Sequence, residues 1–295
     1  MFGRRGVPRQ TGAVHEDPAT RRALRHVAGL AVGGPLDPTL PLTLNFHPDR
    51  LADGVPILRR MAEDGVYLSQ FATGTSNGGL TAHPGGDRWH WESRIFGAAY
   101  DAAPARVRPV YGALNHRLRA VGAAPRFGSA HFRLVPEVLA RSTFCYPDSS
   151  AEPTAFGVAA RCDLVARASA GDLPALDPAL DGYVEAHVHG QVALARDVAA
   201  LVLDPSHRGT PVAEAAVALG CPVEWHPGFR LSLEVLEANA GFRGPAAVAL
   251  GRRLAEHGTL DPRMIGDAAR SGAHDAQELK WLWHCLVRFG TPGQP

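Results

Sequence analysis

Hydrophobic and polar residues alternate in several short segments of the chain. This spacing predicts β-strands, because successive side chains of a strand point to opposite faces. The clearest case is Tyr183–Val188, where Val184, Ala186 and Val188 separate polar residues. Further strands are predicted at Leu40–Phe46, Val107–Leu114, His131–Val135, Ser142–Tyr146, Ala199–Leu203 and Pro222–His226.

Apolar residues at helical spacing occur between and after these strands. Helices are predicted at Asp53–Asp64, Trp89–Tyr100 and Pro211–Leu219, and one is expected to be capped near Asp17–Pro18. From Leu231 onward the pattern is helical. Strands and helices do not alternate as βαβ units, which favours an α+β fold over a doubly wound sheet.

We therefore expect a single domain with a central mixed, mostly antiparallel sheet and a helical C-terminal appendage. Residues 1–22 are interpreted as a flexible N-terminal arm, residues 23–230 as the α+β catalytic core, and residues 231–295 as a helical part of the same domain. The glycine-rich segment Gln70–Gly86 is too long to be only a linker, and it is expected to lie over a cleft.

Composition narrows the classes of partner. The 295 residues carry a formal net charge of +1, so a nucleic-acid or anionic membrane surface is not expected to be the main partner. A run of about 18 apolar residues, as a membrane span requires, does not occur. The four cysteines are far apart in the sequence and are expected to be free thiols, which agrees with a cytoplasmic location.

The candidate chemistry is concentrated in Tyr183–Gly190 (YVEAHVHG). On a strand, Tyr183, Glu185, His187 and His189 share one face, and such groups are costly to bury unless they are hydrogen-bonded. Two interpretations stay open: an ordinary exposed polar face, or a catalytic carboxylate, Glu185, among titratable neighbours.

A metal site is a further alternative. His187 and His189 could bind one divalent ion, with Asp204, His207 or His226 as a third ligand. None of these three occurs at a recognisable ligand spacing.

Other candidates come from earlier and middle segments. Arginine suits phosphate binding, because its planar guanidinium pairs with two oxygens at once, although a structural salt bridge is the simpler role. An aromatic residue of the segment RWHWE could stack on a flat ring, and a Ser-Thr pair on a strand can brace a neighbouring side chain. The candidates for cofactor binding are His47, Arg50, Arg88, Arg108, Tyr111, Ser142 and Thr143.

The chain resembles an uncharacterised bacterial family known only as a domain of unknown function. In chain order, the motifs that carry this resemblance are FHPDR, QFATGTSNGG, RWHWE, RPVYGALN, RFGSAHFRL, RSTF, YVEAHVHG, LVLDPSHRGT and VEWHPGF. This likeness runs from about Leu42 to Phe229 and implies no activity.

A second resemblance, to ADP-ribosyltransferases, lies in a basic residue on an early strand, a Ser-Thr strand and a strand bearing a Glu. It implies that Glu185 is the catalytic carboxylate and that Ser142 braces it. In those enzymes a second Glu or Gln often stands two residues from the catalytic Glu, where this chain has Tyr183 and His187.

Together these features lead to a hypothesis of NAD-dependent ADP-ribosyl transfer or NAD glycohydrolysis, with NAD as substrate, no metal ion and an unknown acceptor that could be a protein. The alternatives are a metal-dependent hydrolase using His187 and His189, and a non-catalytic module that binds a nucleotide or a protein.

Overall fold

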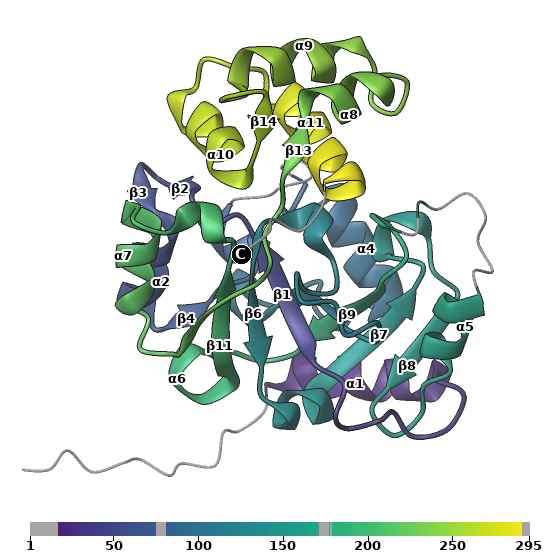
Figure 1. Ribbon diagram of the computed structural model, residues 1–295. Helices are drawn as coiled ribbons and strands as arrows, with labels where there is room; N and C mark the ends of the chain where they lie inside the picture. The colour runs from purple at the N-terminus through teal and green to yellow at the C-terminus, as the bar shows by residue number, and fades with distance from the viewer. Residues whose placement is uncertain (1–16, 75–80, 171–176, 178, 291–295) are drawn as a thin grey trace, which may run out of the picture.

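The computed structural model describes residues 17–74, 81–170, 177 and 179–290 (Figure 1). Helices and strands are interspersed along this part of the chain, and the fold is α+β, as the sequence predicts. The α-helices are α1 (Pro18–Leu30), α2 (Ile57–Asp64), α3 (Gln70–Thr73), α4 (Asp87–Ile95), α5 (Leu164–Ala170), α6 (Leu194–Asp197), α7 (Pro211–Val217), α8 (Leu233–Ala238), α9 (Pro245–Leu254), α10 (Pro262–Ser271) and α11 (Ala276–Phe289). Short 3₁₀ helices are η1 (Ala105–Val107), η2 (Pro125–Phe127), η3 (Pro136–Arg141), η4 (Ser149–Ala151) and η5 (Pro205–His207).

A mixed sheet is the centre of the fold. In the described residues it has eight strands in the order β12 (Val223–Trp225), β11 (Val198–Leu203), β6 (Ala130–Leu134), β1 (Leu42–Phe46), β5 (Val110–Leu114), β9 (Val184–Val188), β7 (Ser142–Tyr146) and β8 (Ala155–Val158). Neighbouring strands are antiparallel except for β11 and β12, which are parallel. This confirms the expected mostly antiparallel sheet. Two-stranded pairs are formed by β4 (Val66–Tyr67) with β10 (Val192–Ala193), β13 (Leu231–Ser232) with β14 (Thr259–Leu260), and β2 (Leu51–Ala52) with β3 (Val55–Pro56).

The sheet is weakly joined at its middle, between β1 and β5. Their pairing covers only Leu42 with Leu114 and Thr43 with Ala113. Beyond that point β1 continues along β6, up to Phe46, while β5 stays paired with β9 along its whole length. The two strands therefore diverge at one end of the sheet, and each follows a different neighbour.

Alternation gives β9 one apolar face and one polar face. Val184, Ala186 and Val188 are fully buried in the main hydrophobic core, which α2, α5 and α7 cover. Glu185 and His187 point to the opposite face, and they are buried as well. The polar face is thus not an exposed surface, and each of its polar groups needs a partner.

The ends of the chain pack on this core. Helix α1 is capped by Asp17, as expected, and buries Ala19, Ala23 and Val27 against α4 and the residues after it. Residues 18–22 therefore belong to a packed helix and not to a flexible arm; residues 1–16 lie outside the described residues.

Helices α8–α11 lie together at one end of the sheet (Figure 1), where they form a second hydrophobic core. This agrees with the helical C-terminal appendage that the sequence predicts. None of the helices in the described ranges combines the length and the apolar character that crossing a membrane requires.

Several element boundaries differ from the prediction. The start of the predicted helix Asp53–Asp64 forms a tight hairpin of β2 and β3, and α2 begins only at Ile57. The predicted helix Trp89–Tyr100 starts at Asp87 and ends at Ile95, before a turn at Gly97. Strand β8 was not predicted, because its four residues include Gly157 and show no alternation.

Candidate active site

Glu185 lies in the middle of β9 with only 8% of its side chain exposed. Its Oε1 accepts a hydrogen bond from the backbone N–H of Ser149 at 3.1 Å and lies 2.9 Å from Nε2 of His187. The thiol of Cys145 donates to the same oxygen at 3.7 Å. Within the described residues, the hydrogen bonds to this carboxylate all reach Oε1, and none reaches Oε2.

A buried chain of hydrogen bonds runs from Glu185 towards α1. His187 Nδ1 lies 3.1 Å from Oγ1 of Thr143, the same oxygen lies 2.9 Å from His189 Nε2, and His189 Nδ1 lies 2.7 Å from the hydroxyl of Tyr100. Burial lowers the pKa of His189 well below its usual value, so this ring is neutral and carries one N–H. Thr143 thus bridges the two imidazole rings, and His187 connects them to the Glu185 carboxylate.

Ser142 does not brace Glu185, contrary to the expectation. Its hydroxyl donates to the carbonyl of Val138 at 2.8 Å, and it pairs with Val188 across the ladder. Because strand residues alternate, Thr143 and Cys145 share the face of Glu185, whereas Ser142 points to the other face.

Arg108 does not offer a free charge to a phosphate, which corrects a second expectation. Its Nη1 lies 2.6 Å from Oε2 of Glu92, with exposed fractions of 3% and 0%, and its Nη2 donates to the carbonyl of Tyr100 at 2.8 Å. Burial raises the pKa of Glu92 to about 7, and the Arg108 guanidinium opposes that shift. Arg108 therefore has the structural role that was its simpler interpretation.

Tyr111 connects this buried network to open space. Its ring packs edge-on against His187, with ring centroids 5.0 Å apart, and its hydroxyl donates to Oε1 of Glu92 at 3.2 Å. The guanidinium of Arg88 lies 4.4 Å from the centre of the Tyr111 ring and 5.3 Å from that of Trp91. Arg88 thus covers a face of the Tyr111 ring, and His187 packs edge-on against the same ring.

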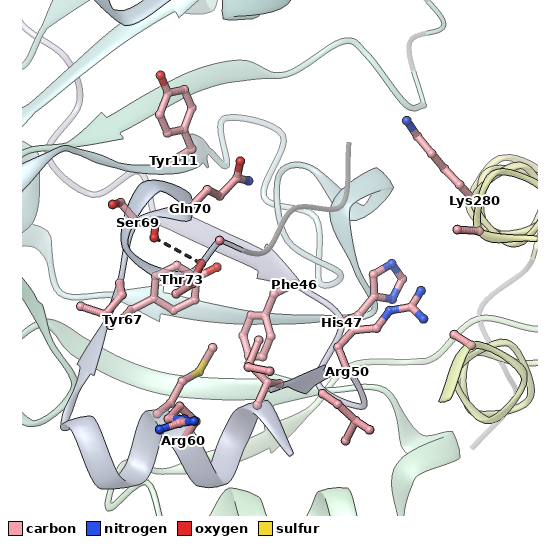
Figure 2. Close-up of a pocket in the computed structure, with 18 of the residues that line it drawn as sticks. Phe46, His47, Arg50, Arg60, Tyr67, Ser69, Gln70, Thr73, Tyr111 and Lys280 are labelled. Carbon is pink, nitrogen blue, oxygen red and sulfur yellow. Dashed lines mark hydrogen bonds between the residues drawn. The ribbon is translucent and has the colours of Figure 1, made fainter. Parts of the chain in front are cut away.

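A cavity of about 920 Å³ lies at the end of the sheet where β1 and β5 diverge. Phe46 and His47 line it from the end of β1, and Tyr111 lines it from β5 (Figure 2). Val110, at the start of β5, lines it as well. Arg50, also among the predicted residues, lines the same cavity. The structure therefore brings together His47, Arg50 and Tyr111, which the sequence singled out separately.

The glycine-rich segment contributes to this cavity through its described beginning. Gln70, Thr73 and Gly74 line the cavity. Gln70–Thr73 form the short helix α3, where an irregular loop was expected. Residues 75–80 lie outside the described residues, and residues 81–86 do not line this cavity, so the prediction that the segment lies over a cleft agrees with the structure only at its start.

Sequence reasoning did not find the part of the cavity wall that comes from α11. Lys280 and Trp283 line the cavity, and both face it because they are three residues apart on one helix. They are more than 200 residues from His47 in the sequence. The sequence feature that could have indicated this contribution of α11 is Lys280, because it is the only lysine of the chain.

The proposed third metal ligands are not near His187. Asp204 follows β11 and His226 follows β12, and three strands lie between β11 and β9 in the sheet. Strands are spaced by about 4.8 Å, so these side chains are roughly 20 Å from His187. Asp204 accepts hydrogen bonds from the backbone of Ser206 and Phe229 instead.

His187 and His189 do not point to a common ion either, since both nitrogens of His189 have hydrogen-bond partners. The donor atoms that do converge on His187 are those of Cys145 and Glu185, and all three lie within 4.8 Å of one another. Cys145 was not among the predicted site residues.

Residues 41–173 and 172–289 match a protein family described as "Protein of unknown function (DUF3626)". The chain belongs to this family. The match agrees with the resemblance to an uncharacterised family that the motifs indicate. No curated protein of known identity matches the chain. Both Glu185 and α11 lie inside the matched DUF3626 segments, so the sheet and the C-terminal helices are parts of one family domain.

Proposed function

We propose that this protein cleaves the bond between nicotinamide and ribose in NAD, as an ADP-ribosyltransferase or an NAD glycohydrolase, with Glu185 as the catalytic carboxylate. The observation that supports this most directly is the position of Glu185. It neighbours His187 on the polar face of β9, and His187 is paired with Tyr111, which lines the cavity. A cavity of about 920 Å³ lies within the range of small-molecule sites, about 300–1,000 Å³.

The chemistry requires a negative charge beside the ribose. When the bond between ribose C1′ and nicotinamide breaks, the electron pair leaves with nicotinamide and the sugar becomes oxocarbenium-like. Oε2 of Glu185 is suited to stabilise that positive charge, because Oε1 is held by Ser149 and His187 and does not need to reorganise. Water or an acceptor group then adds to C1′ and releases a proton.

The remaining groups fit binding of the substrate. Tyr111 lines the cavity and lies edge-on to His187, so its ring is placed for contact with an aromatic ring such as nicotinamide. His47 and Arg50 lie at the other side of the cavity, where a phosphate can be bound.

The proposal includes a cytoplasmic location, which the four free thiols support. The acceptor is water for a glycohydrolase, and a protein is the macromolecular acceptor to test first.

The test is release of nicotinamide from NAD by the wild type and by Glu185→Gln. We expect the amide to keep the fold and much of the NAD affinity, while kcat falls by roughly a hundredfold to a thousandfold. Glu224→Gln is the matched control, because Glu224 lies at the exposed edge strand β12, paired with Arg133. A wild type that releases nicotinamide no faster than Glu185→Gln, with water or any acceptor tried, would contradict the proposal.

A second candidate function, metal-dependent hydrolysis, is favoured by one observation. Cys145 Sγ, Glu185 Oε1 and His187 Nε2 are separated by 2.9, 3.7 and 4.0 Å. A tetrahedral Zn²⁺ with bond lengths of about 2.0–2.3 Å places its ligand atoms roughly 3.3–3.6 Å apart, so small movements would make three ligands and leave one position open for water. The ligand set differs from the predicted His187 and His189.

A chelator separates the two candidates. NAD cleavage by Glu185 continues in the presence of a chelator, whereas metal-dependent hydrolysis stops and returns when Zn²⁺ is added. Cys145→Ser weakens zinc binding only in the metal enzyme, and Cys162→Ser is its matched control. If the protein binds a nucleotide without any turnover, the result supports the third hypothesis, a non-catalytic module that binds a nucleotide.

A further inference from the structure

Lys280 has an unusual environment for a lysine. It lines the cavity from α11, and no carboxylate of a described residue lies within ion-pair distance of its Nζ. Burial lowers its pKa, and the positive charges of Arg126 and Arg243 lower it further. A cation that is partly buried beside other cations gains from an anionic ligand.

The backbone of α11 is held firmly against the core near Lys280. Trp283, one turn further on, donates from Nε1 to the carbonyls of Pro125 and Arg126 at 3.1 and 3.0 Å. Its ring packs edge-on against His47, with centroids 4.8 Å apart. Lys280 is therefore presented to the cavity from a fixed position and not from a loose surface helix.

Arg50 is a second cation that lines this cavity. No described residue forms an ion pair or a hydrogen bond with its guanidinium, although its neighbour Asp49 favours the charged form. Figure 2 shows Arg50 and His47 on the β1 side of the cavity and Lys280 reaching out from α11.

The other charges of the wall are largely satisfied. Arg126 pairs with Asp181, and Arg60 lies 3.8 Å from Asp53. The carboxylate of Asp275 caps α11 by accepting from two backbone N–H groups. Among the described residues that line the cavity, Arg50 and Lys280 are therefore the arginine and lysine without an ion pair, and Asp64 is a carboxylate without one.

We propose that Arg50 and Lys280 bind the diphosphate group of a nucleotide, one cation at each phosphate, so that α11 forms part of the substrate site. Two separated cations suit an anion with two charged groups better than a single phosphate. The inference deepens the proposed function, because NAD carries such a diphosphate, but it predicts binding that does not depend on turnover.

Calorimetric titration with ADP, AMP and inorganic pyrophosphate tests it. We expect Lys280→Gln to weaken ADP and pyrophosphate binding by about tenfold or more, as loss of one charged hydrogen bond does. Lys280→Arg should keep most of the affinity. Arg252→Gln, which removes an exposed cation of α9, should leave it unchanged. Stronger binding of ADP than of pyrophosphate identifies a nucleotide site, and AMP should bind more weakly than ADP.

The single lysine also allows a direct measurement. Reductive ¹³C-methylation labels only Lys280 and the α-amino group, and the lysine signal should shift when pyrophosphate is added. The pKa read from that signal should be lower than that of a free lysine and should rise with ligand bound.

The two proposals fail differently. If diphosphate binding depends on Lys280 but no nicotinamide is released, the proposed cleavage of NAD is contradicted and the diphosphate site is not. Release of nicotinamide by a protein whose Lys280→Gln variant binds ADP as tightly as the wild type would overturn the diphosphate site only.

Discussion

Thr143 holds two imidazoles in place with one hydroxyl group. It can donate to one ring and accept from the other, and His187 in turn contacts the Glu185 carboxylate. A hydroxyl can do both at once, which neither valine nor alanine can. Thr143 is therefore a positioning residue, since it acts on Glu185 only through His187.

We expect Thr143→Val to lower kcat about tenfold, as loss of a hydrogen bond of roughly 1.5 kcal/mol would do. Without the hydroxyl, the His187 ring can turn or change tautomer, so the acidic limb of the pH profile of kcat/KM should also move. Thr143→Ser keeps the hydroxyl and should restore both the rate and the profile. A Thr143→Val enzyme with reduced stability but an unchanged pH profile would show that Thr143 is only structural.

The face on which a residue lies was predicted well where the alternation of a strand determines it. The role of a residue was predicted poorly where that role depends on a partner from another element. Alternation places Glu185 and His187 on one face of β9, and the structure confirms this. The same rule separates Ser142 from Thr143, so treating them as a pair was wrong. The partner of Arg108 could not be predicted, because Glu92 belongs to a helix 16 residues away and nothing local indicates which face of that helix meets β5.

At the scale of elements, the site depends on the divergence of β1 and β5. Gly112 lies where these strands are still close. A Cβ at this position would be 2.5 Å from Cδ2 of Leu44 and 2.7 Å from the carbonyl oxygen of Thr43. Only glycine lets β5 pass this close to β1 before the strands separate.

Gly112→Ala should therefore lower the free energy of unfolding by about 1–3 kcal/mol, the usual cost of overpacking. Urea unfolding monitored by circular dichroism measures it. Gly29→Ala is the matched control: Gly29 lies in α1 with no atom within 4 Å of its added Cβ, so this change should be neutral or stabilise by about 0.5–1 kcal/mol. Equal stability of both variants would mean that β1 and β5 are not packed as described.

The elements themselves followed largely from local pattern. Ser142–Tyr146 matches its prediction, and the other predicted strands differ by a few residues at their ends. The order of strands could not be predicted in the same way. Strand β9 lies between β5 and β7, which come much earlier in the chain, and this depends on side-chain packing across the whole sheet. The position of the cavity depends on that strand order, so it could not be predicted from the sequence either.

At the scale of the whole molecule, several histidines are buried as neutral rings. Burial is the main cause that lowers the pKa of His47 and His189 well below 6.5, and that lowers the pKa of His131 and His284 to about 3. His47 and His189 directly follow β1 and β9, His131 lies in β6 and His284 lies in α11, so both the sheet and the C-terminal helices contribute. Their protonation is linked to unfolding of the molecule as a unit.

The sign of this linkage follows from the pKa values. Between pH 6.5 and about 3, unfolded His131 binds a proton and folded His131 does not, so the free energy of unfolding falls as the pH falls. One such group contributes a slope of about 1.4 kcal/mol per pH unit.

We expect His131→Gln to lose this slope, so that its stability relative to the wild type improves steadily from pH 6.5 to pH 4. Urea unfolding at a series of pH values measures the difference, in which the contributions of other groups cancel. His90→Gln, at an exposed position of α4, should run parallel to the wild type. A His131→Gln variant that also runs parallel would mean that His131 is protonated in the folded protein.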